Sequence, residues 1–264
     1  MLKLEALNKS FNKDTINETV IFDNFNLKVN KGDFITIVGS NGAGKSTLLN
    51  LISGALEQDS GKIILEGKDI TKLKEHKRAK AMSRVFQDPT KGTSPSMTIL
   101  ENLSLADNKG KSFGLSLGIN KKRIEEFKEQ LAILNLGLED KLNTKVGMLS
   151  GGQRQALSLL IATLNIPRLL LLDEHTAALD PKTSETIINL TNSIIKEKNI
   201  TAIMITHNLS HAIKYGNRLL MMHRGKTIFD IGKEEKSKLT KTDLIEEFNK
   251  VAFKEELSDR SLFA

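Results

Sequence analysis

Cysteine and tryptophan are absent from the sequence, and its 264 residues include one tyrosine and four prolines. Without cysteine, disulfides and thiolate metal sites are excluded, and the composition fits a reducing compartment. No apolar run approaches the roughly 18 residues that a membrane-spanning helix needs, and the charged start of the sequence does not resemble a secretory signal. We therefore expect a chain that is soluble or that docks on a partner embedded in the membrane.

Basic residues outnumber acidic ones by 39 to 32, which gives a net charge of +7. A nucleic-acid-binding surface needs clustered lysine and arginine with aromatic residues between them. Here the lysines are scattered and aromatics are scarce, at 5% of the chain. We therefore predict a lysine-rich solvated surface and no nucleic-acid partner.

The hydrophobic pattern predicts an α/β chain with an inserted helical part. Residues 1–32 alternate apolar and polar side chains, which is typical of antiparallel strands, and residues 34–39 form a short β-branched run typical of a buried parallel strand. A mainly helical pattern occupies about 90–157, with a helix from about Ser96, a Gly/Ser-rich mobile connection over 109–120 and a helix capped by Asn120. The α/β pattern then resumes. We predict one domain over 1–232 and a short helix and tail over 233–264.

The segment after the strand 34–39 carries a phosphate-binding motif. Residues 39–47 match G-x-x-x-x-G-K-[ST] between a strand and a helix. The glycines let backbone N–H groups converge on phosphates at the positive end of the helix. Lys45 can reach the β- and γ-phosphates, and the Ser46 hydroxyl can bind Mg²⁺. The predicted nucleotide-binding residues here are Gly39, Ser40, Asn41, Gly42, Ala43, Gly44, Lys45, Ser46 and Thr47.

Polar side chains follow three other predicted strands. Asp173 and Glu174 end the apolar run 169–172, and ligands in open α/β sheets bind at such carboxyl ends. Asp173 is predicted to hold Mg²⁺, directly or through water, and Glu174 to act as general base toward the attacking water. Gln87 follows the strand AMSRVF, and its amide can bind Mg²⁺ or that water. His207 is predicted to end the strand TAIMITH and to hold Glu174 and the γ-phosphate in register.

A second Gly-rich helix start stands at Ser150-Gly151-Gly152, before a helix that begins near Gln153. A hydroxyl and bare N–H groups at a helix N-terminus form a second phosphate clamp. One chain has no evident use for both clamps on one nucleotide. In a two-fold dimer, each Ser150 segment would face the other chain's Lys45 loop.

The pentapeptide LSGGQ over 149–153, with the phosphate loop before it and LLLLDE after it, resembles an ATP-binding cassette (ABC) ATPase. The resemblance extends over roughly 1–232. It implies a P-loop NTPase fold with a RecA-like core, an N-terminal antiparallel β subdomain and an inserted α-helical subdomain. It also implies ATP and Mg²⁺ as ligands. Implied roles are Phe11 stacking on adenine, Gln87 in the glutamine loop, Gln153 in the signature, Asp180 in the loop that crosses the dimer interface, and His207 as the switch histidine.

The sequence departs from the family pattern at a few positions. Phe11 replaces the usual tyrosine but keeps the aromatic face that stacks on the base. His175 stands where proline is common, so we expect a changed loop shape without lost chemistry. The segment before the signature lacks the glutamate pair typical of exporters, which favours an importer.

With one cassette and no membrane span, the resemblance implies a separate ATPase subunit on the cytoplasmic face of the membrane. Its implied partners are a second copy of itself, integral membrane permease subunits and an extracytoplasmic substrate-binding protein. The helical insert and the loop after Gln87 would form the docking groove. The solute is expected to be small and polar, with an amino acid as a candidate. Two alternatives stay open: a soluble regulatory ATPase without a permease, and a module that binds nucleotide without hydrolysing it.

Overall fold

The central element of the fold is a six-stranded sheet in the order β10-β9-β3-β8-β7-β6. The structure, a computed structural model, describes residues 1–110 and 118–250. Neighbouring strands are parallel except β9 and β10, which form an antiparallel hairpin. The strands are β3 (Phe34–Gly39), β6 (Met82–Val85), β7 (Leu169–Asp173), β8 (Ala202–Ile205), β9 (Arg218–His223) and β10 (Lys226–Ile231).

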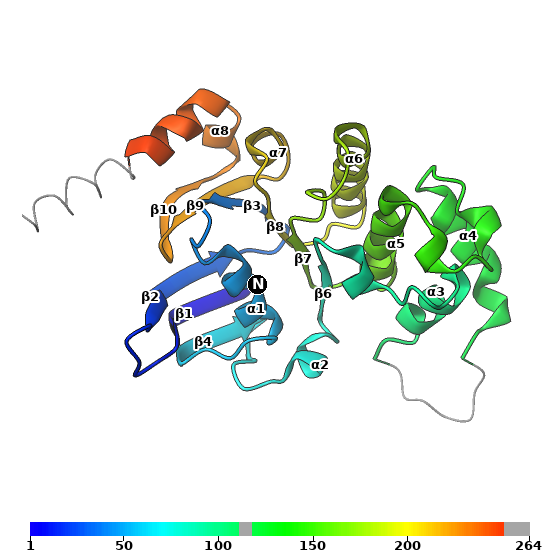
Figure 1. The fold of residues 1–264 in the computed structure, drawn as a ribbon, viewed down its shortest axis with the longest axis horizontal. Coiled ribbons are helices and arrows are strands. Elements are labelled where there is room, and N and C mark those ends of the chain that lie inside the picture. Colours follow the sequence, from blue (N-terminus) through cyan, green and yellow to red (C-terminus); the bar gives the residue numbers. More distant parts are fainter. Residues whose placement is uncertain (111–117, 251–264) are drawn as a thin grey trace, which may run out of the picture.

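A separate antiparallel sheet is built mostly from the start of the chain, as the alternation predicts (Figure 1). Its order is β2-β1-β4-β5. Its strands are β1 (Leu2–Phe11), β2 (Thr19–Val29), β4 (Ser60–Leu65) and β5 (Lys68–Asp69). Its buried side chains share one core cluster with helix α1 (Lys45–Ser53). This sheet therefore supports the helix that follows the phosphate loop.

Both faces of the central sheet are buried, because alternate residues of each strand enter different clusters. Leu169 and Leu171 of β7 pack with α1, whereas Leu170 and Leu172 pack with the cluster of α6 (Pro181–Glu197). The carboxyl ends of β3, β7 and β8 thus meet at one edge between two helix layers. The remaining short helices of this part are α2 (Glu75–Arg78), α7 (Leu209–Lys214) and α8 (Lys233–Lys236).

The helical part lies to one side of the central sheet (Figure 1). It has its own apolar cluster, in which Phe127 and Leu131 pack with Leu103 and Leu157. Its elements are η1 (Pro89–Gly92), α3 (Ile99–Asp107), η2 (Lys121–Arg123), α4 (Ile124–Ala132), η3 (Glu139–Lys141), η4 (Val146–Met148) and α5 (Gly151–Leu164). The predicted limits of the helical part, 90–157, and of the whole domain, 1–232, stay predictions. Helix α5 packs with both the helical part and the core, so it marks no sharp boundary between them.

Several predicted helix ends move by a few residues. Helix α3 begins at Ile99 rather than about Ser96, because Thr98 and Glu101 form a capping box. Asn120 caps the 3-10 turn η2, which leads into α4. Helix α5 begins at Gly151 rather than near Gln153. The predicted mobile connection lies largely over 111–117, outside the described residues.

The end of the chain contains more structure than the single short helix predicted. Beyond α8, residues 241–250 are helical, and Leu244 is buried against Val38 and Leu219 of the central sheet. The predicted tail over 251–264 lies outside the described residues. Over 1–110 and 118–250, no helix combines the length and apolarity that crossing a bilayer requires.

Lys236 makes the stability of this end sensitive to pH. It is 3% exposed, and its ammonium donates to Thr36 Oγ1 at 3.0 Å and to the Tyr215 carbonyl. Burial lowers the pKa of Lys236 to about 7. Between that value and the ordinary lysine range the unfolded chain binds one more proton, so the free energy of unfolding rises with pH.

We predict that this rise is smaller in Lys236→Met by up to about 1.4 kcal/mol per pH unit above pH 7. Urea unfolding at pH 7, 8 and 9 measures the difference. Lys233→Met, on the same short helix and exposed to solvent, is the control. If the free energy of unfolding changes with pH equally in wild type and Lys236→Met, the buried amine keeps its ordinary pKa.

Candidate nucleotide-binding and hydrolysis site

The phosphate loop connects β3 to α1 and is fixed by close backbone approaches. A Cβ at Gly39 would lie 2.2 Å from the Met222 carbonyl oxygen of β9. Gly44, the residue before the helix, has φ 93°, which favours glycine. Both glycines are therefore needed for the backbone path of the loop. The structure places residues 39–47 together as the motif predicts.

Lys45 lies at the centre of this loop. It is 5% exposed, and its Nζ donates to the carbonyl oxygens of Gly39 and Ser40 at 2.8 and 2.9 Å. Burial lowers the pKa of Lys45, and the negative charges of Glu174 and Asp173 partly oppose this. The two carboxylates predicted from the strand end thus act electrostatically on the lysine of the phosphate loop. A buried cation in a glycine-rich loop is suited to a polyphosphate.

Glu174 directly follows β7 and has an unusual backbone. Its φ is +47°, in the left-handed region that side chains other than glycine seldom adopt. Such strain is typical of functional sites. Its Oε1 lies 2.7 Å from His207 Nε2, and the carboxylate is 14% exposed. The predicted pairing of the two side chains is present, although β8 ends at Ile205, so the prediction that His207 ends the strand was wrong by two residues.

A cleft of about 710 Å³ opens beside this pair. Its wall includes Glu174, Ala177 and His207. A carboxylate beside an imidazole in such a cleft can accept a proton from water and be held in place while it does so. The roles assigned to Glu174 and His207 remain predictions.

The donors predicted for Mg²⁺ are all oxygens, as a hard cation requires. Ser46 is exposed at the first turn of α1, and Asp173 ends β7 on the same edge of the sheet. Within the described residues, no group of three acidic, histidine or cysteine side chains could hold a metal alone. Mg²⁺ at nucleotide sites is commonly held by one or two carboxylates together with phosphates and water. Bound there, Mg²⁺ would neutralise charge on the phosphates.

Gln87 and Phe11 both lie at the surface. Gln87 is exposed just beyond β6, and the backbone before it is held by Gln155, whose side chain donates to the Phe86 carbonyl at 3.3 Å. Phe11 is 38% exposed at the end of β1, with Lys9 Nζ 5.6 Å from the ring centroid. An exposed ring is available for stacking on a base, so the adenine role stays a prediction.

The signature segment is an exposed helix start on the helical part. Ser150 Oγ accepts from the Gln153 amide at 3.2 Å, and the Gln153 side chain accepts from the Ser150 amide. A Cβ at Gly152 would lie 2.4 Å from Thr183 Cγ2, so this glycine allows α5 to approach α6. Asp180 caps α6 by accepting from the Thr183 amide at 3.0 Å. Figure 1 shows α1 and α5 apart, on different sides of β6 and β7.

Two contacts at this site escaped the sequence interpretation. His223 Nδ1 lies 3.2 Å from Ser40 Oγ of the phosphate loop. Arg84 of β6 forms an ion pair with Asp173, 2.5 Å from Nη2 to Oδ2. The sequence did contain a signal for Arg84, since it is the one charged residue of the short strand β6.

His175 is buried against α6. Its Nε2 lies 3.0 Å from Thr191 Oγ1, and burial lowers its pKa to about 3, so the ring is neutral at physiological pH. The side chain thus packs inward, where it fixes the turn after Glu174. This is the position where proline was expected from the resemblance.

Comparison with known proteins decides the family. The sequence model described as ABC transporter matches residues 22–177. The chain belongs to the ABC transporter family. It is therefore an ABC ATPase that binds ATP, and its two sheets and helical part are the P-loop NTPase fold predicted from the sequence.

Individual ABC proteins resemble the chain over most of its length. A protein from Clostridioides difficile (strain R20291) named tyrosine transport ATP-binding protein is 50% identical, over 94% of this chain and 98% of that protein. The spermidine/putrescine import ATP-binding protein PotA of Mannheimia succiniciproducens is 37% identical over 85% of this chain, which spans about half (56%) of that protein. The cassette MJ0796, solved as a dimer in a post-hydrolysis state with ADP and Pi, matches 88% of this chain with a TM-score of 0.74 and 28% identity.

Proposed function

We propose that this ABC ATPase is the ATP-hydrolysing subunit of a membrane transporter that imports an amino acid. The observation that carries the proposal is the 50% identity, along almost the full length of both chains, to a protein named for tyrosine transport. The solute would be bound by other subunits, so the proposal rests on that likeness rather than on a solute pocket here. Its partners would be permease subunits and an extracytoplasmic substrate-binding protein, and it would lie on the cytoplasmic face of the membrane.

The catalytic proposal assigns a role to each member of the site. The residues 39–47 and Phe11 hold the nucleotide, with Mg²⁺ on Ser46, Asp173 and Gln87. Glu174 accepts the proton of the attacking water. His207, 2.7 Å away, holds that carboxylate and donates toward the γ-phosphate.

A homodimer would complete each pocket. Residues 150–153 and Asp180 of one copy would face the nucleotide on the loop of the other. The exposure of Ser150 and Gly151 supports this, as does Met148, a large apolar side chain that is 77% exposed two residues before them. Exposed apolar side chains at a polar surface are typical of contact sites.

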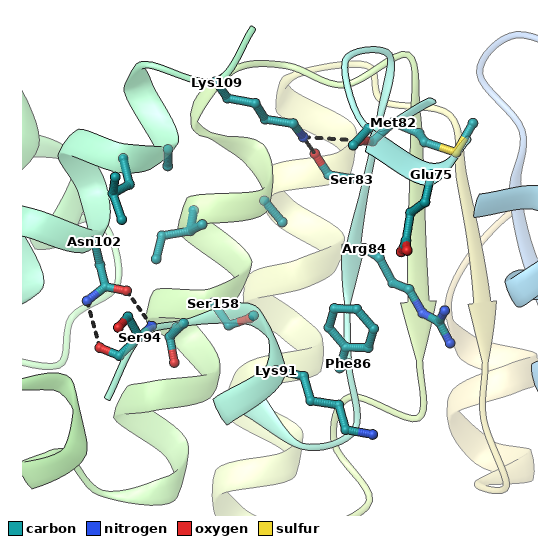
Figure 2. A pocket seen from close by; sticks show the side chains of 17 residues that line it. Glu75, Met82, Ser83, Arg84, Phe86, Lys91, Ser94, Asn102, Lys109 and Ser158 are labelled. Carbon is teal, nitrogen blue, oxygen red and sulfur yellow. Dashed lines mark hydrogen bonds between the residues drawn. The ribbon is translucent and has the colours of Figure 1, made fainter. Parts of the chain in front are cut away.

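The docking groove for the permease is proposed at a cleft of about 570 Å³ between β6 and the helical part (Figure 2). Phe86, directly before Gln87, lines it, and so does Leu105 of α3, which is 53% exposed. The loop η1 approaches α5 closely here, because a Cβ at Gly92 would lie 2.6 Å from Ser158 Oγ. A permease segment seated in the cleft would therefore contact the loop that carries Gln87.

Uptake by cells tests the transport proposal. In a strain lacking this chain, we expect radiolabelled tyrosine uptake to be restored by wild type and by Glu66→Gln, but to stay below about 5% of wild type with Glu174→Gln. Membrane fractionation with and without the co-expressed permease is the second measurement. Uptake that is independent of the chain, together with its absence from membranes, would favour the soluble regulatory ATPase instead.

A further inference from the structure

Arg84 contacts both Asp173, the carboxylate proposed to bind Mg²⁺, and Phe86, which lines the proposed docking groove. Its Nη2 lies 2.5 Å from Asp173 Oδ2, and its Nη1 donates to Asn50 Oδ1 of α1 at 2.7 Å. The guanidinium carbon lies 4.7 Å from the centroid of the Phe86 ring. Figure 2 shows the side chain leaving β6 at the edge of the cleft, with the guanidinium directed away from the helical part.

Both members of the ion pair are largely shielded from water. The Arg84 side chain is 12% exposed and that of Asp173 is 15% exposed. Charges at short range in such surroundings interact more strongly than at the surface. The Nε of Arg84 is buried and has no hydrogen-bond partner among the described residues, so part of its donor capacity is unused. The contact with Asp173 is thus a strong one on an incompletely satisfied side chain.

The consequence concerns the oxygen that the ion pair occupies. Asp173 is the one carboxylate among the proposed Mg²⁺ ligands, and Arg84 holds one of its two oxygens. A cation beside a metal site lowers the affinity for the metal by repulsion and by occupying a ligand atom. The opposite effect is also known: a residue that hydrogen-bonds a metal ligand can orient that ligand and raise the affinity for the metal. The short, buried ion pair favours competition here.

We propose that Arg84 is a positioning residue that competes with Mg²⁺ for the Asp173 carboxylate and so sets how strongly Mg²⁺ supports nucleotide binding. The inference rests on the proposed Mg²⁺–nucleotide site. Arg84 does not touch the nucleotide in this account and acts only through Asp173. Because Arg84 lines the cleft, its proposed effect on Mg²⁺ affinity arises next to the proposed docking surface.

A binding experiment tests the proposal without relying on turnover. A fluorescent ADP is bound to the purified chain in EDTA and then titrated with Mg²⁺. In Arg84→Met we expect the Mg²⁺ concentration at half-effect to fall about three- to tenfold, with ADP affinity in EDTA unchanged within about two-fold. Arg84→Lys, which keeps the charge, should stay near wild type. Electron paramagnetic resonance of Mn²⁺ with the same variants measures the metal directly.

The control is Arg168→Met, which removes an arginine–carboxylate pair with Glu66 at the surface. It should leave the Mg²⁺ titration unchanged. A higher Mg²⁺ requirement in Arg84→Met would show that Arg84 supports Asp173, and an unchanged one would show that it has no effect; either result overturns the proposal. A wild-type chain whose nucleotide binding ignores Mg²⁺ would instead overturn the proposed metal site.

Discussion

Glu174→Gln is expected to bind ATP within about two-fold of wild type and to hydrolyse it at least about 100-fold more slowly. Glutamine has the shape of glutamate and can keep the contact with His207, which lies 2.7 Å from Oε1. Its amide cannot accept the proton of an attacking water. Single-turnover hydrolysis of radiolabelled ATP measures the slow step, and a fluorescent ATP analogue measures binding.

The control for this variant is Glu66→Gln, which makes the same change at a surface ion pair whose arginine, Arg168, lies before β7, at the end of the strand opposite Glu174. Its turnover should match wild type. Because the slow variant retains ATP, it should also accumulate an ATP-dependent dimer, visible by light scattering after gel filtration. Turnover of Glu174→Gln within tenfold of wild type would assign the proton transfer to another group.

A mixture of two inactive variants is expected to regain hydrolysis. Lys45→Ala removes the cation proposed to face the phosphates, and Ser150→Arg is expected to block the proposed second clamp. Each variant alone should show less than about 1% of wild-type turnover, whereas random pairing in a one-to-one mixture should restore about a quarter, because half the dimers contain one intact pocket. Steady-state ATPase activity over a range of mixing ratios measures the gain.

Ser150→Arg also removes a helix cap, which costs about 1 kcal/mol. Thr98→Arg is the matched control, since Thr98 forms the same capping box at the start of α3. If Thr98→Arg hydrolyses ATP normally, lost capping does not explain the inactivity of Ser150→Arg. A mixture that stays inactive, beside a monomer that hydrolyses ATP at full rate, would exclude the shared pocket.

Most of the architecture could be predicted because the order of apolar and polar side chains in a strand shows whether one or both of its faces are buried. The alternation in β1 and β2 marks a sheet buried on one face, and the apolar run of β7 marks a strand buried on both. The helix starts were less certain: Thr98 and Glu101 have the spacing of a capping box, but the sequence interpretation placed the start of α3 at about Ser96.

The site was predictable where residues are adjacent in the sequence and less so where the sheet brings them together. The phosphate loop is continuous, so its composition identifies it. The ion pair between Arg84 and Asp173 depends instead on the register of β6 on β7, in which Arg84 pairs with Leu171 and so shares a face with the residue two places further on. His223 reaches Ser40 for a similar reason, through the pairing of β9 with β3.

The close approach of α5 to α6 has a mechanical consequence. Gly152 admits Thr183 to its side, and a Cβ at Gly151 would touch Leu179 Cδ2 at 3.5 Å. A rotation of the helical part that preserves these contacts must carry the start of α6 with it, and with α6 the turn beginning at Glu174. If the proposed dimer forms, the segment that would present Ser150 to one nucleotide therefore moves together with Glu174, the proposed base for the other nucleotide.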